Sequence, residues 1–185
     1  MKLKLKISLF LSVLLVILGV SCSRPADKLL SEDVEVGSHV FTREQVSNML
    51  YTNGMPFISI TLTDEFYIAP TANWIKTTYS DKLTKFLFDY NLNHWTRESS
   101  DCDDISRAAA VYSSILFHNS KNRPKGKGLL FGEFHYIKAG AGGHAINFAI
   151  AKSGDKYKLV FYEPQKKFEI ELSEDEKSSV MWARF

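Results

Sequence analysis

Cysteine is almost absent from this chain of 185 residues, which contains two, Cys22 and Cys102. Cys22 follows a predicted export signal, so Cys102 is the only cysteine that we expect in the globular part. This scarcity excludes an intramolecular disulfide framework. A free cysteine in an exported protein is exposed to an oxidising compartment, which suggests that the thiol of Cys102 itself has a use.

The sequence also lacks an excess of charge of either sign. It has 23 basic and 21 acidic side chains. Residues 1–21 contain three of the lysines and no acid, and without them the net charge is −1. The basic patch expected of a nucleic-acid-binding protein is missing, so we predict no nucleic-acid partner. There is no internal repeat or low-complexity tract, and the remaining ~160 residues suffice for one domain with a core.

Long apolar runs are absent except at the N-terminus. Three lysines in the first six residues precede an apolar run from Ile7 to Val20, which is too short for a membrane span and typical of an export signal. The ending Leu18–Cys22 resembles a bacterial lipoprotein signal and predicts lipidation of Cys22, with ordinary cleavage near Ser21 as the alternative. We expect a protein exported to the bacterial cell envelope and anchored to a membrane by lipid. The predicted parts are a signal peptide at 1–21, a tether at 22–37 and a domain at 38–185.

Local patterns predict helices followed by a sheet. Thr42 and Gln45 form a capping box for a helix through Leu50. A second helix is expected from Ser80 to Tyr90, and a third, capped by Ser100, has apolar residues at spacings of three and four. This order indicates an α+β fold with an antiparallel sheet. The expected strands are 57–68, 129–137, 145–151, 157–163, 167–172 and 180–185.

The third helix begins with the run Asp101-Cys102-Asp103-Asp104. Unpaired N–H groups of a first helical turn favour a thiolate, by roughly 0.3–1 kcal/mol at an exposed site. A carboxylate about 6 Å from the sulfur opposes the thiolate by roughly 2–3 kcal/mol. The acids must therefore point away, be paired, or bind a divalent cation such as calcium. The alternative is that they only cap the helix.

The predicted hairpin around Ser153-Gly154 brings a histidine and an acid together. A turn at these residues places Ile150 opposite Tyr157, and the same register places His144 opposite Glu163. Glu163 could then orient the imidazole so that its other nitrogen faces a thiol. A cross-strand pair without a catalytic role is the simpler alternative.

These blocks together resemble a known family. Trp95, the Asp101–Asp104 run, Gly143–Asn147 and Tyr162–Gln165 are similar to the papain-like peptidase domain at the C-terminus of the Marasmius oreades agglutinin. Nothing in the chain resembles the lectin half of that protein. The resemblance implies a papain-like cysteine peptidase fold and activity on a protein or peptide substrate, with calcium or a similar divalent cation. It implies Cys102 as nucleophile, His144 as base, Glu163 as orienting acid, Gln165 as a polar residue beside them, and Asp103, Asp104 and Asp101 as metal ligands.

The main prediction is therefore a lipid-anchored cysteine peptidase with a Cys–His–Glu triad, activated by calcium. Two alternatives stay open. One is a cell-wall amidase or endopeptidase, which the location at the envelope favours. The other is a non-catalytic surface interaction module on a retained peptidase fold.

Overall fold

The computed structural model describes residues 33–56, 59–94, 96 and 100–185. These residues belong to one compact unit, Glu32–Phe185. The predicted signal peptide, Cys22, most of the predicted tether and Trp95 lie outside the described residues. Among the helices that are described, none combines the length and the apolar character needed to cross a membrane.

Two sheets form the centre of the unit. The larger sheet has the strand order β2-β9-β5-β6-β7-β8, and the smaller sheet has the order β1-β3-β4. Neighbouring strands are antiparallel except for the pairs β2–β9 and β3–β4. The bounds are β1 Val36–Thr42, β2 Ile60–Thr61, β3 Phe66–Pro70, β4 Gly128–Leu129, β5 Phe131–Lys138, β6 Gly142–Ser153, β7 Lys156–Glu163, β8 Phe168–Ile170 and β9 Val180–Arg184.

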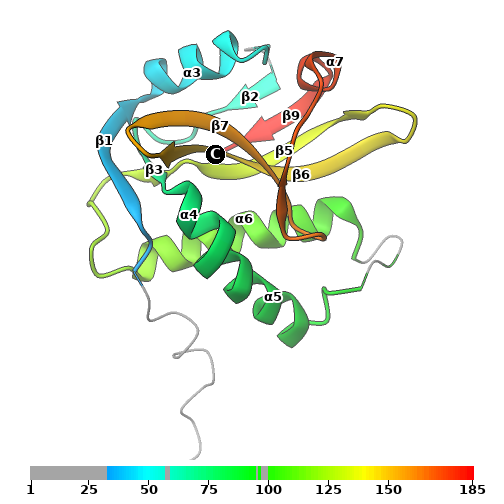
Figure 1. Cartoon of the computed structure of the whole chain (residues 1–185), viewed down its shortest axis with the longest axis horizontal. Coiled ribbons are helices and arrows are strands. Elements are labelled where there is room, and N and C mark those ends of the chain that lie inside the picture. The colour runs from blue at the N-terminus through cyan, green and yellow to red at the C-terminus, as the bar shows by residue number, and fades with distance from the viewer. Residues whose placement is uncertain (1–32, 57–58, 95, 97–99) are drawn as a thin grey trace, which may run out of the picture. The chain divides into compact units, whose positions relative to one another are not determined.

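Helices cover both sides of the larger sheet (Figure 1). On one side, α3 packs its buried Val46 and Leu50 against the apolar face of the strands. On the other side lie α4, α5 and α6 (Figure 1). The short helix α7 directly precedes β9 in the chain. The fold is thus a mixed α and β arrangement rich in antiparallel pairing, as predicted. The helix bounds are α3 Arg43–Thr52, α4 Ala72–Trp74, α5 Ser80–Asp89, α6 Cys102–Asn119 and α7 Glu174–Ser178.

Two of the predicted helix starts are wrong. The helix expected from Ser80 begins earlier, at α4, where the Thr71 hydroxyl accepts from Trp74 N–H, and continues through a π-helical segment, Ile75–Tyr79. Ser80 lies inside this helical run, and its hydroxyl accepts from the Tyr162 hydroxyl at 3.1 Å. For α6, the N-cap is Asp101 and not Ser100, and it makes no side-chain capping bond. The backbone of Ser100 pairs instead with Thr96.

Other boundaries also differ from the prediction. The expected strand 57–68 is two short strands, β2 and β3, which belong to different sheets. Helix α7 was missed, although Ser173 and Glu176 form the kind of capping box that marks a helix start. The predicted capping box of α3 is confirmed, with Thr42 and Gln45 in both bonds. Strand β1 begins at Val36, inside the segment predicted as tether.

The hairpin that joins β6 and β7 turns one residue later than predicted. Ser153 pairs with Lys156, and Gly154 at φ +60° occupies the first central position of a two-residue turn. Ile150 therefore faces Leu159 and not Tyr157. This slip of two residues keeps every side chain on its predicted face of the sheet, because side chains alternate with a period of two.

Candidate functional site

His144, near the start of β6, and Glu163, the last residue of β7, form a pair that is largely buried, with side chains 16% and 4% exposed. The imidazole Nε2 of His144 lies 2.8 Å from Oε2 of Glu163, so Nε2 donates when the carboxyl is ionised. The side chain of Glu163 is 4% exposed, and its Oε1 accepts from the backbone N–H of Gln165 at 3.3 Å. The His144 ring also packs edge-on against Tyr136, with the ring centroids 5.8 Å apart. The structure thus brings His144 and Glu163 together, while Gln165 contributes a backbone group and lies on the surface.

Cys102 is the first residue of α6 and is partly exposed as a free thiol. It lies within electrostatic range of Tyr136. Burial, followed by the charges of Glu176, Glu163 and Cys102, raises the pKa of Tyr136 to about 12. In the part of the chain that the structure describes, however, the sulfur makes no hydrogen bond to His144. Of the predicted triad, the structure therefore contains the hydrogen bond between His144 and Glu163 but none between His144 and Cys102.

Asp101, Asp103 and Asp104 lie together at the start of α6, and we call this group the acidic tip. One oxygen from each lies within 4.8 Å of the others. A hydrogen bond between the carboxyl groups of Asp101 and Asp103, which needs one proton between them, lowers the pKa of Asp101 and raises that of Asp103. Oδ1 of Asp101 is buried and has no hydrogen-bond partner among the described residues. Clustered carboxylate oxygens with an unsatisfied buried member fit a hard divalent cation such as calcium.

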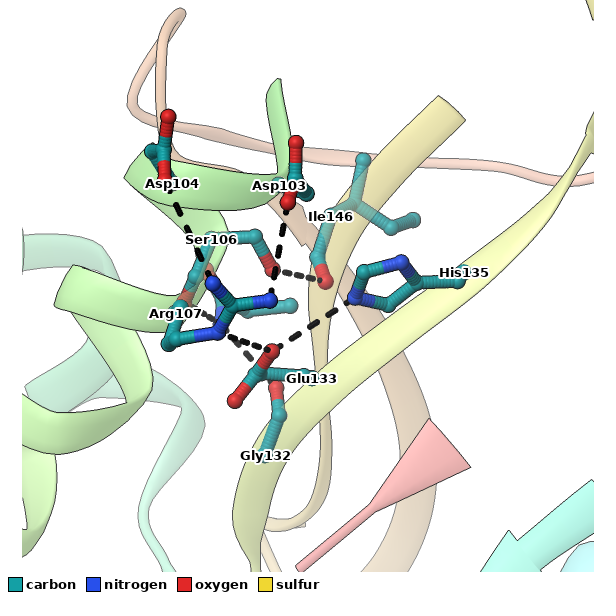
Figure 2. Close-up of polar contacts among 9 residues, drawn as sticks. Asp103, Asp104, Ser106, Arg107, Gly132, Glu133, His135 and Ile146 are labelled. Carbon is teal, nitrogen blue, oxygen red and sulfur yellow. Dashed lines mark hydrogen bonds and ion pairs between the residues drawn. The ribbon is translucent and has the colours of Figure 1, made fainter. Parts of the chain in front are cut away.

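The first turns of α6 are fastened to the sheet by buried polar bonds, part of which Figure 2 draws. The hydroxyl of Ser106 donates to the carbonyl of Ile146 at 2.6 Å. The amide of Asn147 donates to the carbonyls of Ser106 and Gly132, at 2.9 and 3.0 Å. Ser106 and Asn147 are fully buried. These bonds fix the acidic tip relative to β5 and β6.

A cleft of about 900 Å³ runs between α6, the start of β5 and the end of β9. Its volume lies within the range of small-molecule sites, about 300–1,000 Å³. Apolar side chains of α6, such as Val111 and Ile115, line it together with the ring of Trp182, which packs edge-on against His135. Six residues with planar polar groups also line the cleft. These are Asp64, Arg107, Asn119, Arg123, Glu133 and Arg184.

No pattern in the sequence predicts this cleft. Arg107, Glu133 and Trp182 come from three separate elements, and only the fold brings them to one place. Two local signals were present. Asp103 and Arg107 have the i,i+4 spacing of a helical ion pair. Glu133 is the only carboxylate in the predicted strand 129–137, and it is 8% exposed.

The fold is similar to that of two solved structures. One is described as the PSL1a-E64 complex, with 19% identity and a TM-score of 0.56 over 79% of this chain and 51% of the other. The second is Polyporus squamosus lectin bound to the human-type influenza-binding epitope Neu5Aca2-6Galb1-4GlcNAc, with 22% identity and a TM-score of 0.55 over 79% of this chain and 49% of the other. This chain thus spans about half the length of each. No family model and no curated protein matches the chain.

These comparisons contradict the predicted cysteine peptidase. One of these structures is described as a lectin bound to a glycan epitope. The prediction of an enzyme, with the hydrolase and thiol-protease classes that follow from it, is therefore wrong. The roles expected of Cys102 as nucleophile, His144 as base, Glu163 as orienting acid and Gln165 as the polar residue beside them stay predictions from the sequence. The findings favour the alternative of a non-catalytic interaction module.

Proposed function

We propose that this chain is a non-catalytic surface binding module that holds an oligosaccharide in the cleft between α6, β5 and β9. The observation that carries the proposal is the composition of that cleft. It combines the Trp182 ring with planar polar side chains on an apolar floor. An aromatic face packs against the C–H groups of a sugar ring, and planar amide, carboxylate and guanidinium groups bind neighbouring hydroxyls. The fungal lectin of similar fold, whose description names a bound glycan, is consistent with this ligand class.

Three further features belong to this proposal. In this proposal the fold is a papain-like scaffold in which α6, β6 and β7 keep their positions but no peptide bond is hydrolysed. The acidic tip holds calcium or a similar divalent cation, whose charge would neutralise Asp101, Asp103 and Asp104 and hold the start of α6 in one conformation. The module is exported, and lipid on Cys22 anchors it at the bacterial envelope.

The test is a calorimetric titration of the full chain with Neu5Acα2-6Galβ1-4GlcNAc and with neutral oligosaccharides of similar length. We expect saturable binding of at least one of them. Trp182→Ala should weaken it at least about 10-fold, equivalent to about 1.4 kcal/mol. Met181→Ala is the matched control, because the neighbouring residue of β9 points to the other face of the strand and is 51% exposed.

Two results would overturn the proposal. One is the absence of binding to every oligosaccharide in the panel. The other is a folded Trp182→Ala variant that binds as tightly as the wild type. Cys102→Ala provides a separate check, since a non-catalytic module should bind its ligand equally well without the thiol. Loss of binding in that variant would locate the ligand at α6's first residue and not in the cleft.

A further inference from the structure

Arg107 stands between the acidic tip and the cleft (Figure 2). Its Nη2 lies 3.5 Å from Oδ2 of Asp103, and its Nη1 lies 4.0 Å from Oδ1 of Asp104. On its other side, Nε lies 3.8 Å from Oε2 of Glu133. One guanidinium group is thus shared by two carboxylates of the tip and one carboxylate of the cleft wall.

Each of these ion pairs is weak enough to exchange. The Arg107 side chain is 54% exposed, and the Asp103 and Asp104 side chains are 42% and 38% exposed. Ion pairs as exposed as these typically contribute at most about 1 kcal/mol, because solvent and salt screen them. None of the three separations is below 3.5 Å. A divalent ion, with twice the charge, is a stronger partner for the same oxygens than this guanidinium.

The partner on the cleft side is better enclosed. The side chain of Glu133 is 11% exposed, and its Oε2 also lies 3.5 Å from Nε2 of His135. A guanidinium that leaves the tip therefore has a carboxylate within reach. Arg107 and Glu133 both line the cleft, so a movement of this side chain changes the cleft wall.

The backbone around Arg107 is held in place. The preceding residue, Ser106, is bound through its hydroxyl to Ile146 and through its carbonyl to Asn147. Asn147 also binds the carbonyl of Gly132, next to Glu133. These bonds hold the backbone beside the tip and the backbone beside the cleft wall together, while the side chain of Arg107 is 54% exposed and has room to respond to an ion.

We propose that Arg107 is a built-in counter-charge of the acidic tip, which competes with a divalent cation there and turns to Glu133 and the cleft when the cation binds. The inference rests on the cation site and the cleft of the proposed function, and it adds their regulation. By linkage, a cation that displaces Arg107 changes the affinity of the cleft for its ligand, and the ligand changes the affinity of the tip by the same factor.

The experiment titrates calcium into the full chain by calorimetry, without any oligosaccharide. We expect Arg107→Gln to bind calcium roughly 3- to 10-fold more tightly than the wild type, because the competitor is gone. Arg107→Lys should lie near the wild type, since it retains the charge. Arg123→Gln is the matched control: it removes a charge from the same cleft, but its guanidinium contacts His118 and not the tip. It should change the calcium affinity less than about 2-fold, because salt screens the interaction between exposed charges that do not contact each other.

A second readout follows the side chain directly. The Nε–Hε resonance of Arg107 should shift when calcium is added to the wild type, because Nε approaches Glu133. An unchanged calcium affinity in Arg107→Gln, or an unmoved Nε–Hε resonance at saturation, would overturn the proposal, as would an absence of calcium binding in both proteins. These outcomes do not depend on a sugar. If calcium behaves as expected but no oligosaccharide binds, only the ligand class of the proposed function fails.

Discussion

His144 and Glu163 contact each other at 2.8 Å although they are not opposite each other in the sheet. The last backbone pair of β6 and β7 joins Asn147 to Tyr162. His144 lies three residues before that pair and Glu163 one residue after it, so the side chains meet diagonally. Diagonal neighbours on one face lie within reach of long side chains. The contact survives a register that differs from the predicted one by two residues.

The first prediction concerns this pair. Among the described residues, His144→Ala leaves the buried Glu163 carboxylate with the Gln165 N–H as its remaining hydrogen-bond donor, and it should lower the free energy of unfolding by about 2–4 kcal/mol. The same change should cost less in a Glu163→Gln background, where the buried group is neutral. Urea denaturation of the wild type, both single variants and the double variant measures the coupling. Additive effects of the two changes would show that the pair does not stabilise the fold.

The second prediction concerns the attachment of α6. Asn147→Asp keeps the shape of the side chain but replaces the amide donor with a carboxylate facing the carbonyls of Ser106 and Gly132. We expect a loss of about 3 kcal/mol or more in the free energy of unfolding. Asn48→Asp, on the exposed surface of α3, makes the same chemical change and should cost less than about 0.5 kcal/mol. Similar losses in both variants would contradict the proposed role of Asn147.

The third prediction concerns the close approach of β5 and β9. A Cβ at Gly132 would run into the backbone carbonyl of Arg184, and backbone cannot move aside as a flexible side chain can. Gly132→Ala should therefore destabilise the protein by about 3 kcal/mol or more. In Gly143→Ala the new Cβ meets only Met181, at 3.6 Å, an ordinary contact. Thermal unfolding of the two variants compares them, and an equal melting temperature would mean that β9 adapts.

The fourth prediction concerns alkaline pH. Burial raises the pKa of Tyr162 to about 12, while its hydroxyl donates to Ser80. Below about pH 10, the ordinary tyrosine pKa, the phenol is neutral in both the folded and the unfolded state. Between pH 10 and 12 the unfolded state loses its proton first, so stability falls by up to about 1.4 kcal/mol per pH unit for this group.

Tyr162→Phe should reduce that slope, while Tyr136 continues to contribute because burial also raises its pKa to about 12. Chemical denaturation at pH 9, 10 and 11 gives the free energies. The expected result is a wild-type loss between pH 10 and 11 that exceeds the loss in Tyr162→Phe. Parallel curves would mean that Tyr162 ionises in the folded protein as readily as in the unfolded chain.

Helix α6 and the apolar faces of the strands could be predicted from the sequence because both follow from local periodicity. The turn could not. Sliding the hairpin by two residues leaves large apolar side chains opposite one another, with Phe148 facing Phe161 in the observed register. The hydrophobic pattern therefore fixes which face a residue occupies but not its partner. The position of Gly154, the residue that takes φ +60°, decides between the two registers.

The start of α6 shows a second limit. Ser100 has the sequence position of a cap, but its backbone pairs with Thr96, and the cap falls to Asp101. Similarly, Ser80 is taken up by contacts with Tyr162 from a distant strand. Capping preferences are worth about 1 kcal/mol, so a backbone pairing such as that of Ser100 or a tertiary contact such as that of Ser80 overrides them.

By itself, the sequence determined the α and β composition, the faces of the strands and the proximity of His144 to Glu163, because each depends on repeats of two or three to four residues along the chain. Only the tertiary structure decided that the Cys102 sulfur makes no bond to that imidazole, and that Arg107, Glu133 and Trp182 border one cleft. Those relationships join a helix to two strands that are distant in sequence. Packing of the helix on the sheet sets them, and no local pattern encodes that packing.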